Sequence, residues 1–273
     1  MTGIVAQFIS LVSFGNDFLI NGKMPVDYLQ NNTTFQFCNL VDFRENKKTY
    51  FFSKTKEIVV SNNPIDWFQY LKDHGCKKLR LYYKHSKEQA STKDHQLAGL
   101  VGGGGVWLIE AVYKDYSNYW LNRWAVTNQN AQDRKIWSVN YTLVLSGIET
   151  SDIHIDLTEA KSRLSSTLIE IADFAYNQKL DSWGSQFEKA NKTLESSHPN
   201  ENFYHKDLIV SANYSLISQQ VLFSAGSAWV FGGMGSWNDL SFDKKEDNEK
   251  YDNLSAKLYD NIIEGIIAAV NSY

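Results

Sequence analysis

Three neighbouring stretches decide the fold: VWLIEAVY (106–113), YWLNRWAV (119–126) and IWSVNYTLV (136–144). Each is rich in aromatic and β-branched residues, which favour strands, and polar turns separate one stretch from the next. The connections are shorter than the roughly dozen residues that a crossover between parallel strands requires. Residues 106–144 therefore predict an antiparallel meander of three strands.

Further short strands are expected upstream of this meander. Residues 35–43 and 49–52 predict a hairpin around the polar turn 44–48, and residues 57–60 and 79–83 have the composition of two more strands. These segments would extend the sheet on either side, so the first half of the chain is predicted to be strand-rich.

The apolar N-terminal residues 1–12 share their hydropathy with a signal peptide. They carry no Lys or Arg before the apolar run, and no small-residue cleavage site follows it. No other stretch approaches the roughly 18 consecutive apolar residues that a membrane span needs. We therefore expect a buried strand at residues 1–12, no membrane span and a cytoplasmic protein.

One short helix is expected within the strand-rich half. Asn63 can cap the free N–H groups at its start, and Pro64 fits the first helical position. Phe68 and Leu71 then fall on one face, and Gly75 suits the residue just after the helix end.

The period of the apolar residues changes near residue 156. Asp156 and Glu159 form a capping box, and apolar residues then repeat at three-to-four spacing. Three further helices are predicted: one begins at Ser182, one lies within 211–223, and the last begins at a cap at 243–246 and runs to the C-terminal end. The predicted class is α+β: one domain, 1–273, in which the strand-rich residues 1–150 form an antiparallel sheet and the helical residues 151–273 cover it.

The composition excludes several classes of protein. Hydrophobic residues make up 43% and charged residues 21%, which is typical of a globular chain, and the net charge is −4 without a basic stripe. Nucleic acid is therefore not an expected partner. Cys38, Cys76 and six scattered His show no metal-ligand spacing, so neither a metal nor a cofactor is predicted. The oligomeric state stays open.

Two glycine-rich runs, each followed by a tryptophan, are the most unusual feature. The first is 102–105 and the second is 232–235. The first leads into a strand, which disfavours a phosphate-binding loop. It predicts either a tight or bulged strand entry, or a bare backbone that a ligand or another chain approaches. The predicted binding residues are Gly103, Gly104, Gly105, Trp107, Gly233, Gly235, Trp237, Asn238 and Asp239.

Some of these residues also have a purely structural explanation. Asn238 and Asp239 can simply hold the turn before the last helix. The tryptophans of the meander (Trp107, Trp120, Trp124 and Trp137) are mostly expected in the core, although one or two exposed indoles would indicate a recognition surface.

Three residues are candidates for acid/base chemistry: Glu110, His205 and Asp239. Glu110 and Asp239 lie near the glycine-rich runs, and His205 lies two residues before Asp207. Sequence neighbours point in different directions in a helix or a strand, so His205 can equally be a solvated loop residue.

Two functions remain. The first is a non-enzymatic protein-binding module that sequesters a partner, as toxin-neutralising immunity proteins do. The alternative is an enzyme or receptor for a small polar ligand bound between the two glycine-rich turns. Under either function, we expect the two glycine-rich turns to lie together on one surface of the folded protein.

Overall fold

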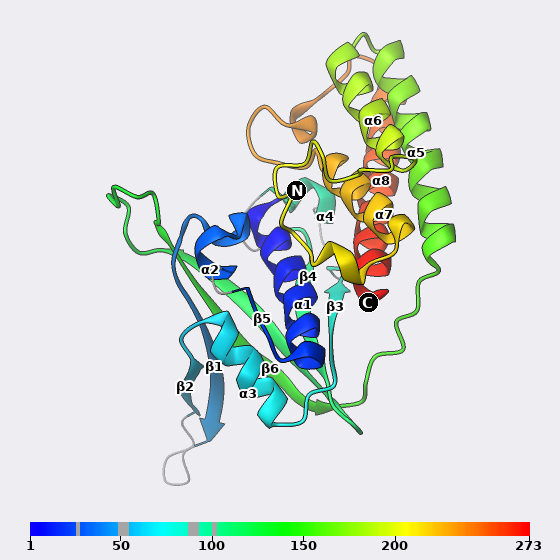
Figure 1. Ribbon diagram of the computed structural model, residues 1–273. Coiled ribbons are helices and arrows are strands. Elements are labelled where there is room, and N and C mark those ends of the chain that lie inside the picture. The colour runs from blue at the N-terminus through cyan, green and yellow to red at the C-terminus, as the bar shows by residue number, and fades with distance from the viewer. Residues whose placement is uncertain (26–27, 49–54, 87–92, 100–102) are drawn as a thin grey trace.

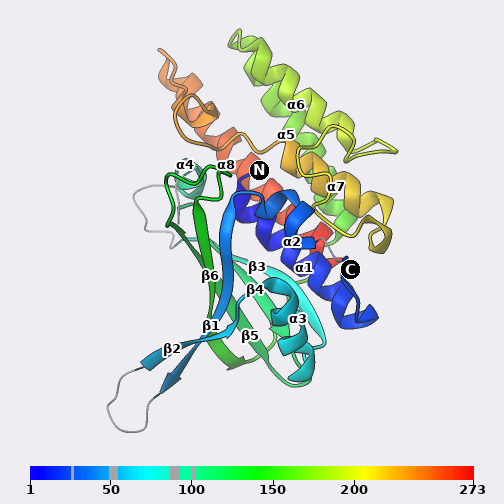
Figure 2. The ribbon, with the colours of Figure 1, turned by 60° about the vertical axis from the view of Figure 1, so that its left-hand side comes forward.

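The computed structural model describes residues 1–25, 28–48, 55–86, 93–99 and 103–273. A six-stranded sheet has the order β2-β1-β6-β5-β4-β3. Helices α1 and α3 lie on one face of it, and α5 to α8 form a bundle beside α1 (Figures 1 and 2). The strands are β1 (Cys38–Lys48), β2 (Thr55–Ser61), β3 (Lys78–Lys84), β4 (Val106–Val112), β5 (Ser117–Val126) and β6 (Trp137–Ile148).

The α+β class and the distribution of strands and helices are confirmed, but the sheet is mixed. Strands β4 to β6 form the predicted antiparallel meander, β3 adds to it antiparallel to β4, and β1 pairs antiparallel with β2. Strand β1 is parallel to β6, with Val41 opposite Val139. The expectation of an antiparallel sheet is therefore wrong at this seam, which joins segments about a hundred residues apart. Residues 49–52 of the predicted hairpin lie outside the described residues.

The N-terminal segment is a helix, α1 (Gly3–Asn21), so the prediction of a strand there is wrong. Thr2 caps the N–H of Val5, and Gly22 ends the helix with φ +67°. By length and composition α1 is the one helix of the described residues that could cross a membrane, yet 72% of that window is buried inside the molecule. A helix that is apolar on all sides and buried shows no helical period in its sequence.

The predicted helices α3 and α5 to α8 begin close to their expected starts. The expectation of one short helix in the strand-rich half is wrong, because α1, α2 and α4 also lie there. The side chains of Asn63 and Asp156 cap α3 and α5. The last helix begins within the predicted 243–246, but Lys244 at its N-cap position makes no side-chain capping bond. The region 211–223 divides into a short 3-10 turn and α7. The helices are α2 (Tyr28–Asn31), α3 (Pro64–Asp73), α4 (Asp94–Leu97), α5 (Leu157–Asn177), α6 (Asp181–Thr193), α7 (Leu216–Ser227) and α8 (Lys245–Asn271).

Two asparagines cover the outer edge of β3. The side chain of Asn16 in α1 accepts from the N–H of Leu79 (2.7 Å) and donates to its carbonyl (2.9 Å). Asn271 in α8 does the same for Leu81 (2.7 and 2.9 Å). An open strand edge is a template for pairing with another chain, and these amides occupy it.

Replacing Asn16 with alanine is expected to lower the free energy of unfolding by about 2 kcal/mol, because two buried main-chain groups of Leu79 lose their partners. Asn21→Ala is the control on the same helix: the exposed Asn21 bonds Asp17 through its side-chain amide (2.8 Å), so a change below about 0.5 kcal/mol is expected. Urea denaturation measures both. Equal effects of the two substitutions would contradict the role given to Asn16.

Candidate functional site

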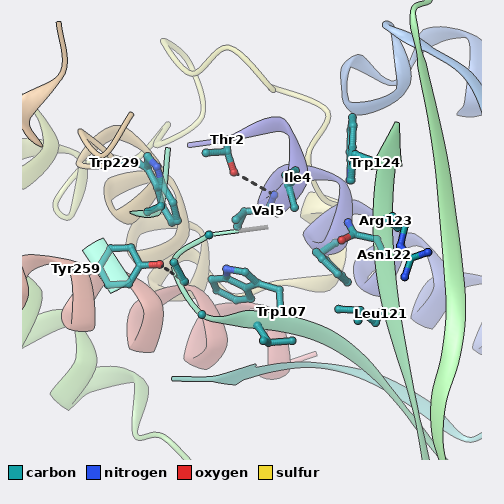
Figure 3. Close-up of a pocket in the computed structure, with 16 residues that line it drawn as sticks. Thr2, Ile4, Val5, Trp107, Leu121, Asn122, Arg123, Trp124, Trp229 and Tyr259 are labelled. Carbon is teal, nitrogen blue, oxygen red and sulfur yellow. Dashed lines mark hydrogen bonds between the residues drawn. The ribbon is translucent and has the colours of Figure 1, made fainter. Parts of the chain in front are cut away.

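A cleft lies where β4 and β5 separate. Their pairing runs from Val112 opposite Ser117 to Ile109 opposite Trp120, and ends there. Beyond that point β4 continues with β3, and β5 continues with β6 to Val126. The widening space holds a cavity of about 370 Å³ (Figure 3).

Three indoles and the first turn of α1 surround this cavity. Trp107 comes from β4 and Trp124 from β5, and Trp229 lies beside Tyr259 on the side opposite Trp124 (Figure 3). Thr2, Ile4, Val5 and Phe8 of the N-terminal segment also line it, together with Ala98, Gly103, Gly104, Gly105, Val106, Leu121, Asn122 and Arg123.

The first glycine-rich turn forms one wall, and its geometry requires glycine. Gly104 and Gly105 have φ of +78° and +81°. A Cβ on Gly103 would lie 2.2 Å from the Leu97 carbonyl oxygen, and one on Gly105 would lie 2.1 Å from the Tyr83 hydroxyl. The hydroxyls of Tyr83 and Tyr259 both donate to the Gly104 carbonyl, at 2.6 Å each. The turn is therefore both a tight entry to β4 and a wall of the cavity.

The main chain of β5 has a free edge in the cleft. The N–H of Thr127 donates to Ile136 at the start of β6 (3.0 Å), so alternate residues of β5 before it also face β6. The main-chain N–H and C=O groups of Asn122 and Trp124 therefore face away from β6, toward β4. Beyond Ile109, however, β4 pairs with β3 and no longer with β5, and no other described strand takes its place.

Two side-chain donors in the cavity wall also lack partners. The indole Nε1 of Trp124 and the amide Nδ2 of Asn122 are buried and make no hydrogen bond of normal geometry with the described residues. The Asn122 amide does lie near the Tyr141 hydroxyl opposite it on β6, where burial raises the pKa of that hydroxyl and the amide partly lowers it. The indole nitrogens of Trp67 and Trp120 are unpartnered as well, but these two rings are fully buried and pack edge to face at 5.4 Å. Of these donors, the two in the cavity wall are placed to meet a ligand.

The second glycine-rich run lies next to the first but does not line the cleft. Trp237 is fully buried, donates from Nε1 to Ser255 (2.8 Å) and packs edge-on against Trp183 and Phe187. Gly233 and Gly235 flank the fully exposed Met234.

Contacts with residues 95–99 connect the two runs. A Cβ on Gly99 would lie 2.1 Å from the Gly232 carbonyl carbon, and Asn238 donates to the His95 carbonyl (2.9 Å). Asp239 accepts from the N–H of Gly235, which closes the turn as the alternative interpretation expects. Trp229, three residues before the second run, lines the cavity, whereas Gly232, Gly233 and Gly235 do not.

Glu110 is fully buried, and both of its carboxylate oxygens are bonded within the protein. Arg80 Nε and the Tyr119 hydroxyl donate to it at 2.9 Å, and the N–H and hydroxyl of Ser151 donate at 2.9 and 2.7 Å. Burial alone would raise the pKa of Glu110, but the Ser151 bonds and the charge of Arg80 bring it below its ordinary value. This arrangement is that of a structural ion pair.

His205 and Asp207 meet through Thr33. The Thr33 hydroxyl lies 2.7 Å from His205 Nδ1 and also bonds an Asp207 oxygen, while the Thr33 N–H donates to the other Asp207 oxygen (2.6 Å). His205 is 8% exposed and lines a second cavity, of about 430 Å³. Thr2, Ile4, Ala98 and Trp124 line both cavities.

Several site residues carried no signal in the sequence. Asn122 and Tyr259 reach the cavity from a strand and a helix predicted only as core elements, and Thr33 meets His205 from a distant segment. Over the described ranges, no group of three or more His, Cys, Asp and Glu gathers as metal ligands.

The sequence matches no protein-family model, no curated protein and no solved structure. The site geometry alone therefore supports the functional inference.

Proposed function

We propose that this chain is a non-enzymatic binding module and that an extended segment of a partner protein pairs with the free edge of β5 in the cleft. The observation that carries the proposal is that, among the described residues, no strand pairs with Asn122 and Trp124 on the side of β5 away from β6, beyond the end of the β4–β5 ladder. Addition of a strand to an open sheet edge is a recurring mode of peptide recognition.

The contrast with β3 strengthens this inference. Asn16 and Asn271 occupy the outer edge of β3, where pairing with another chain would otherwise occur. Proteins generally block exposed edges, so an edge left open beside a cavity is a site for a partner strand.

The side chains around the cleft suit a polypeptide partner. Trp107, Trp124 and Trp229 offer broad apolar faces, and indoles dominate the energetics of many interfaces. The free N–H groups of Trp124 and Asn122 can donate to carbonyl oxygens of the segment. Arg123 alternates with Asn122 and Trp124 on β5, so its exposed side chain lies on the opposite face of the strand. The other described lining residues have no charged side chain, which favours a neutral segment.

Peptides selected from a displayed random library test this proposal. N-methylation of successive amides in a selected peptide is expected to weaken binding at least about 10-fold at every second position and to have little effect between them, because alternate residues of an added strand face β5. An even response along the peptide would contradict strand addition.

A matched pair of variants locates the site. Trp124→Ala is expected to weaken peptide binding about 10- to 30-fold, as for a central interface indole. Trp183→Ala replaces another half-buried indole that packs on Trp237 away from the cleft, so binding should be unchanged. Circular dichroism and thermal unfolding check that both variants are folded.

A small polar ligand is the second candidate. The unpartnered donors of Trp124 and Asn122 favour it, and a cavity of about 370 Å³ falls in the range of small-molecule sites. If no peptide from the library binds in a way that depends on Trp124, the protein-segment proposal is wrong. A small polar ligand then becomes the favoured occupant of the cleft.

A further inference from the structure

The second cavity adjoins the cleft, with which it shares Thr2, Ile4, Ala98 and Trp124, and has its own polar group. We propose that it binds a neutral aromatic small molecule that donates a hydrogen bond from an N–H or O–H group to Nε2 of His205. This inference does not depend on strand pairing at β5, because the residues that carry it are His205, Thr33 and Asp207.

The hydrogen-bond chain fixes the tautomer of His205. The Asp207 carboxylate can only accept, so the single hydroxyl hydrogen of Thr33 points to Asp207. The Thr33 oxygen must then accept from His205, which places the ring hydrogen on Nδ1. Nε2 is left with a lone pair and acts as an acceptor.

His205 is also held neutral. Burial lowers its pKa, and the nearby Asp207 only partly opposes this. Nε2 forms no hydrogen bond with any residue that the structure describes, and it is not among the fully enclosed polar atoms. Nε2 is therefore an accessible acceptor on a ring that is otherwise buried, and the ring lies in the wall of a cavity. This is the position expected of a group that binds a ligand.

The rest of the lining determines the kind of ligand. Trp124 and Trp137 pack edge to face at 5.8 Å, and Phe37 and Tyr204 are 44% and 66% exposed at the rim. Aromatic walls favour a planar apolar ligand. The described lining includes no side chain of Asp, Glu, Lys or Arg. Burial lowers the pKa of the Met1 amino group to about 5, so at neutral pH it is uncharged and a charged ligand would lose its hydration without gaining a counter-charge.

The lining thiol does not point to covalent chemistry. Burial raises the pKa of Cys38 to about 11, and its sulfur accepts a hydrogen bond from the Gln7 amide (3.5 Å). Since the thiolate is the nucleophilic form, Cys38 is poorly suited to attack a ligand. The cavity is therefore assigned to binding.

Indole and 1-methylindole are the test probes, because they differ in the one N–H group that the proposal uses. Calorimetric titration of the full chain is expected to show indole binding about 3- to 10-fold more tightly, the value of one hydrogen bond. In His205→Phe this preference is expected to vanish. Equal affinities in the unchanged protein, or no binding of either probe, would overturn the proposal.

Thr33→Val tests the positioning role of the hydroxyl bridge and serves if His205→Phe does not fold. The variant removes the acceptor for Nδ1–H, so the two tautomers of His205 are expected to exchange and the preference for indole to fall. The ¹⁵N NMR signals of the His205 ring report the tautomer directly. A variant with an unchanged tautomer and an unchanged preference would overturn the assignment of Nε2 as a fixed acceptor.

Discussion

Replacing Glu110 with glutamine is expected to lower the free energy of unfolding by about 3 kcal/mol, one of the two largest effects predicted for this chain. The carboxylate is fully buried, and its partner Arg80 is 17% exposed at the side chain, so the guanidinium loses its counter-charge where little water reaches it. One of the oxygens that now accept from Tyr119 and Ser151 also becomes an NH₂ donor.

Glu264→Gln is the control for this substitution. Glu264 pairs with Arg163 at 2.9 Å, but both side chains are more than 40% exposed, so the loss should stay below about 1 kcal/mol. Urea denaturation at neutral pH compares the two. Equal losses would show that the Glu110 cluster is not the structural element that its geometry indicates.

The same carboxylate predicts a pH dependence. The folded pKa of Glu110 lies below its ordinary value, so its contribution to stability is fully present above the unfolded pKa of about 4.3. The contribution is lost as pH falls through the lower folded pKa. The stability difference between the unchanged protein and E110Q should therefore shrink in acid, and a difference that grows there would contradict the assignment.

Local patterns predicted most elements of this fold. The strands of 106–144 and the capped helix from Asp156 follow from alternation and caps, which neighbouring residues define. Helix α1 could not be predicted in this way, because its apolar residues surround it and leave no period. The parallel seam between β1 and β6 is equally hidden, since the order of strands depends on contacts far apart in the sequence.

The candidate site was only partly predictable. The glycines at 103–105 indicated a backbone that something approaches closely, and the Tyr83 and Tyr259 hydroxyls lie there. Trp237, like Trp107, follows a glycine-rich run with a glycine two residues before it, but it is enclosed by neighbouring aromatic side chains and does not line the cavity, because the tertiary surroundings of the two indoles differ. The cleft itself comes from the point where β4 and β5 stop pairing, which no residue type signals.

Gly105→Ala is expected to lower the free energy of unfolding by about 3 kcal/mol or more, because two costs combine. A side chain at φ +81° is strained, and its Cβ would meet the Tyr83 hydroxyl at 2.1 Å. Relief of that clash requires Tyr83 to move, which breaks its bond to the Gly104 carbonyl and disturbs the wall of the cleft.

Alanine variants of two glycines in the second run distinguish the backbone strain from the steric clash with Tyr83. Gly235 has the same φ, +81°, with nothing within 4 Å of an added Cβ, so Gly235→Ala should cost only the roughly 1 kcal/mol of backbone strain. Gly233 has neither feature, and Gly233→Ala should change stability by less than about 0.5 kcal/mol. Thermal and urea unfolding of the three variants measure the series. If Gly105→Ala proved no worse than Gly235→Ala, the first turn would need glycine for its backbone angles alone, and the close approach of Tyr83 would have no role in holding the cleft open.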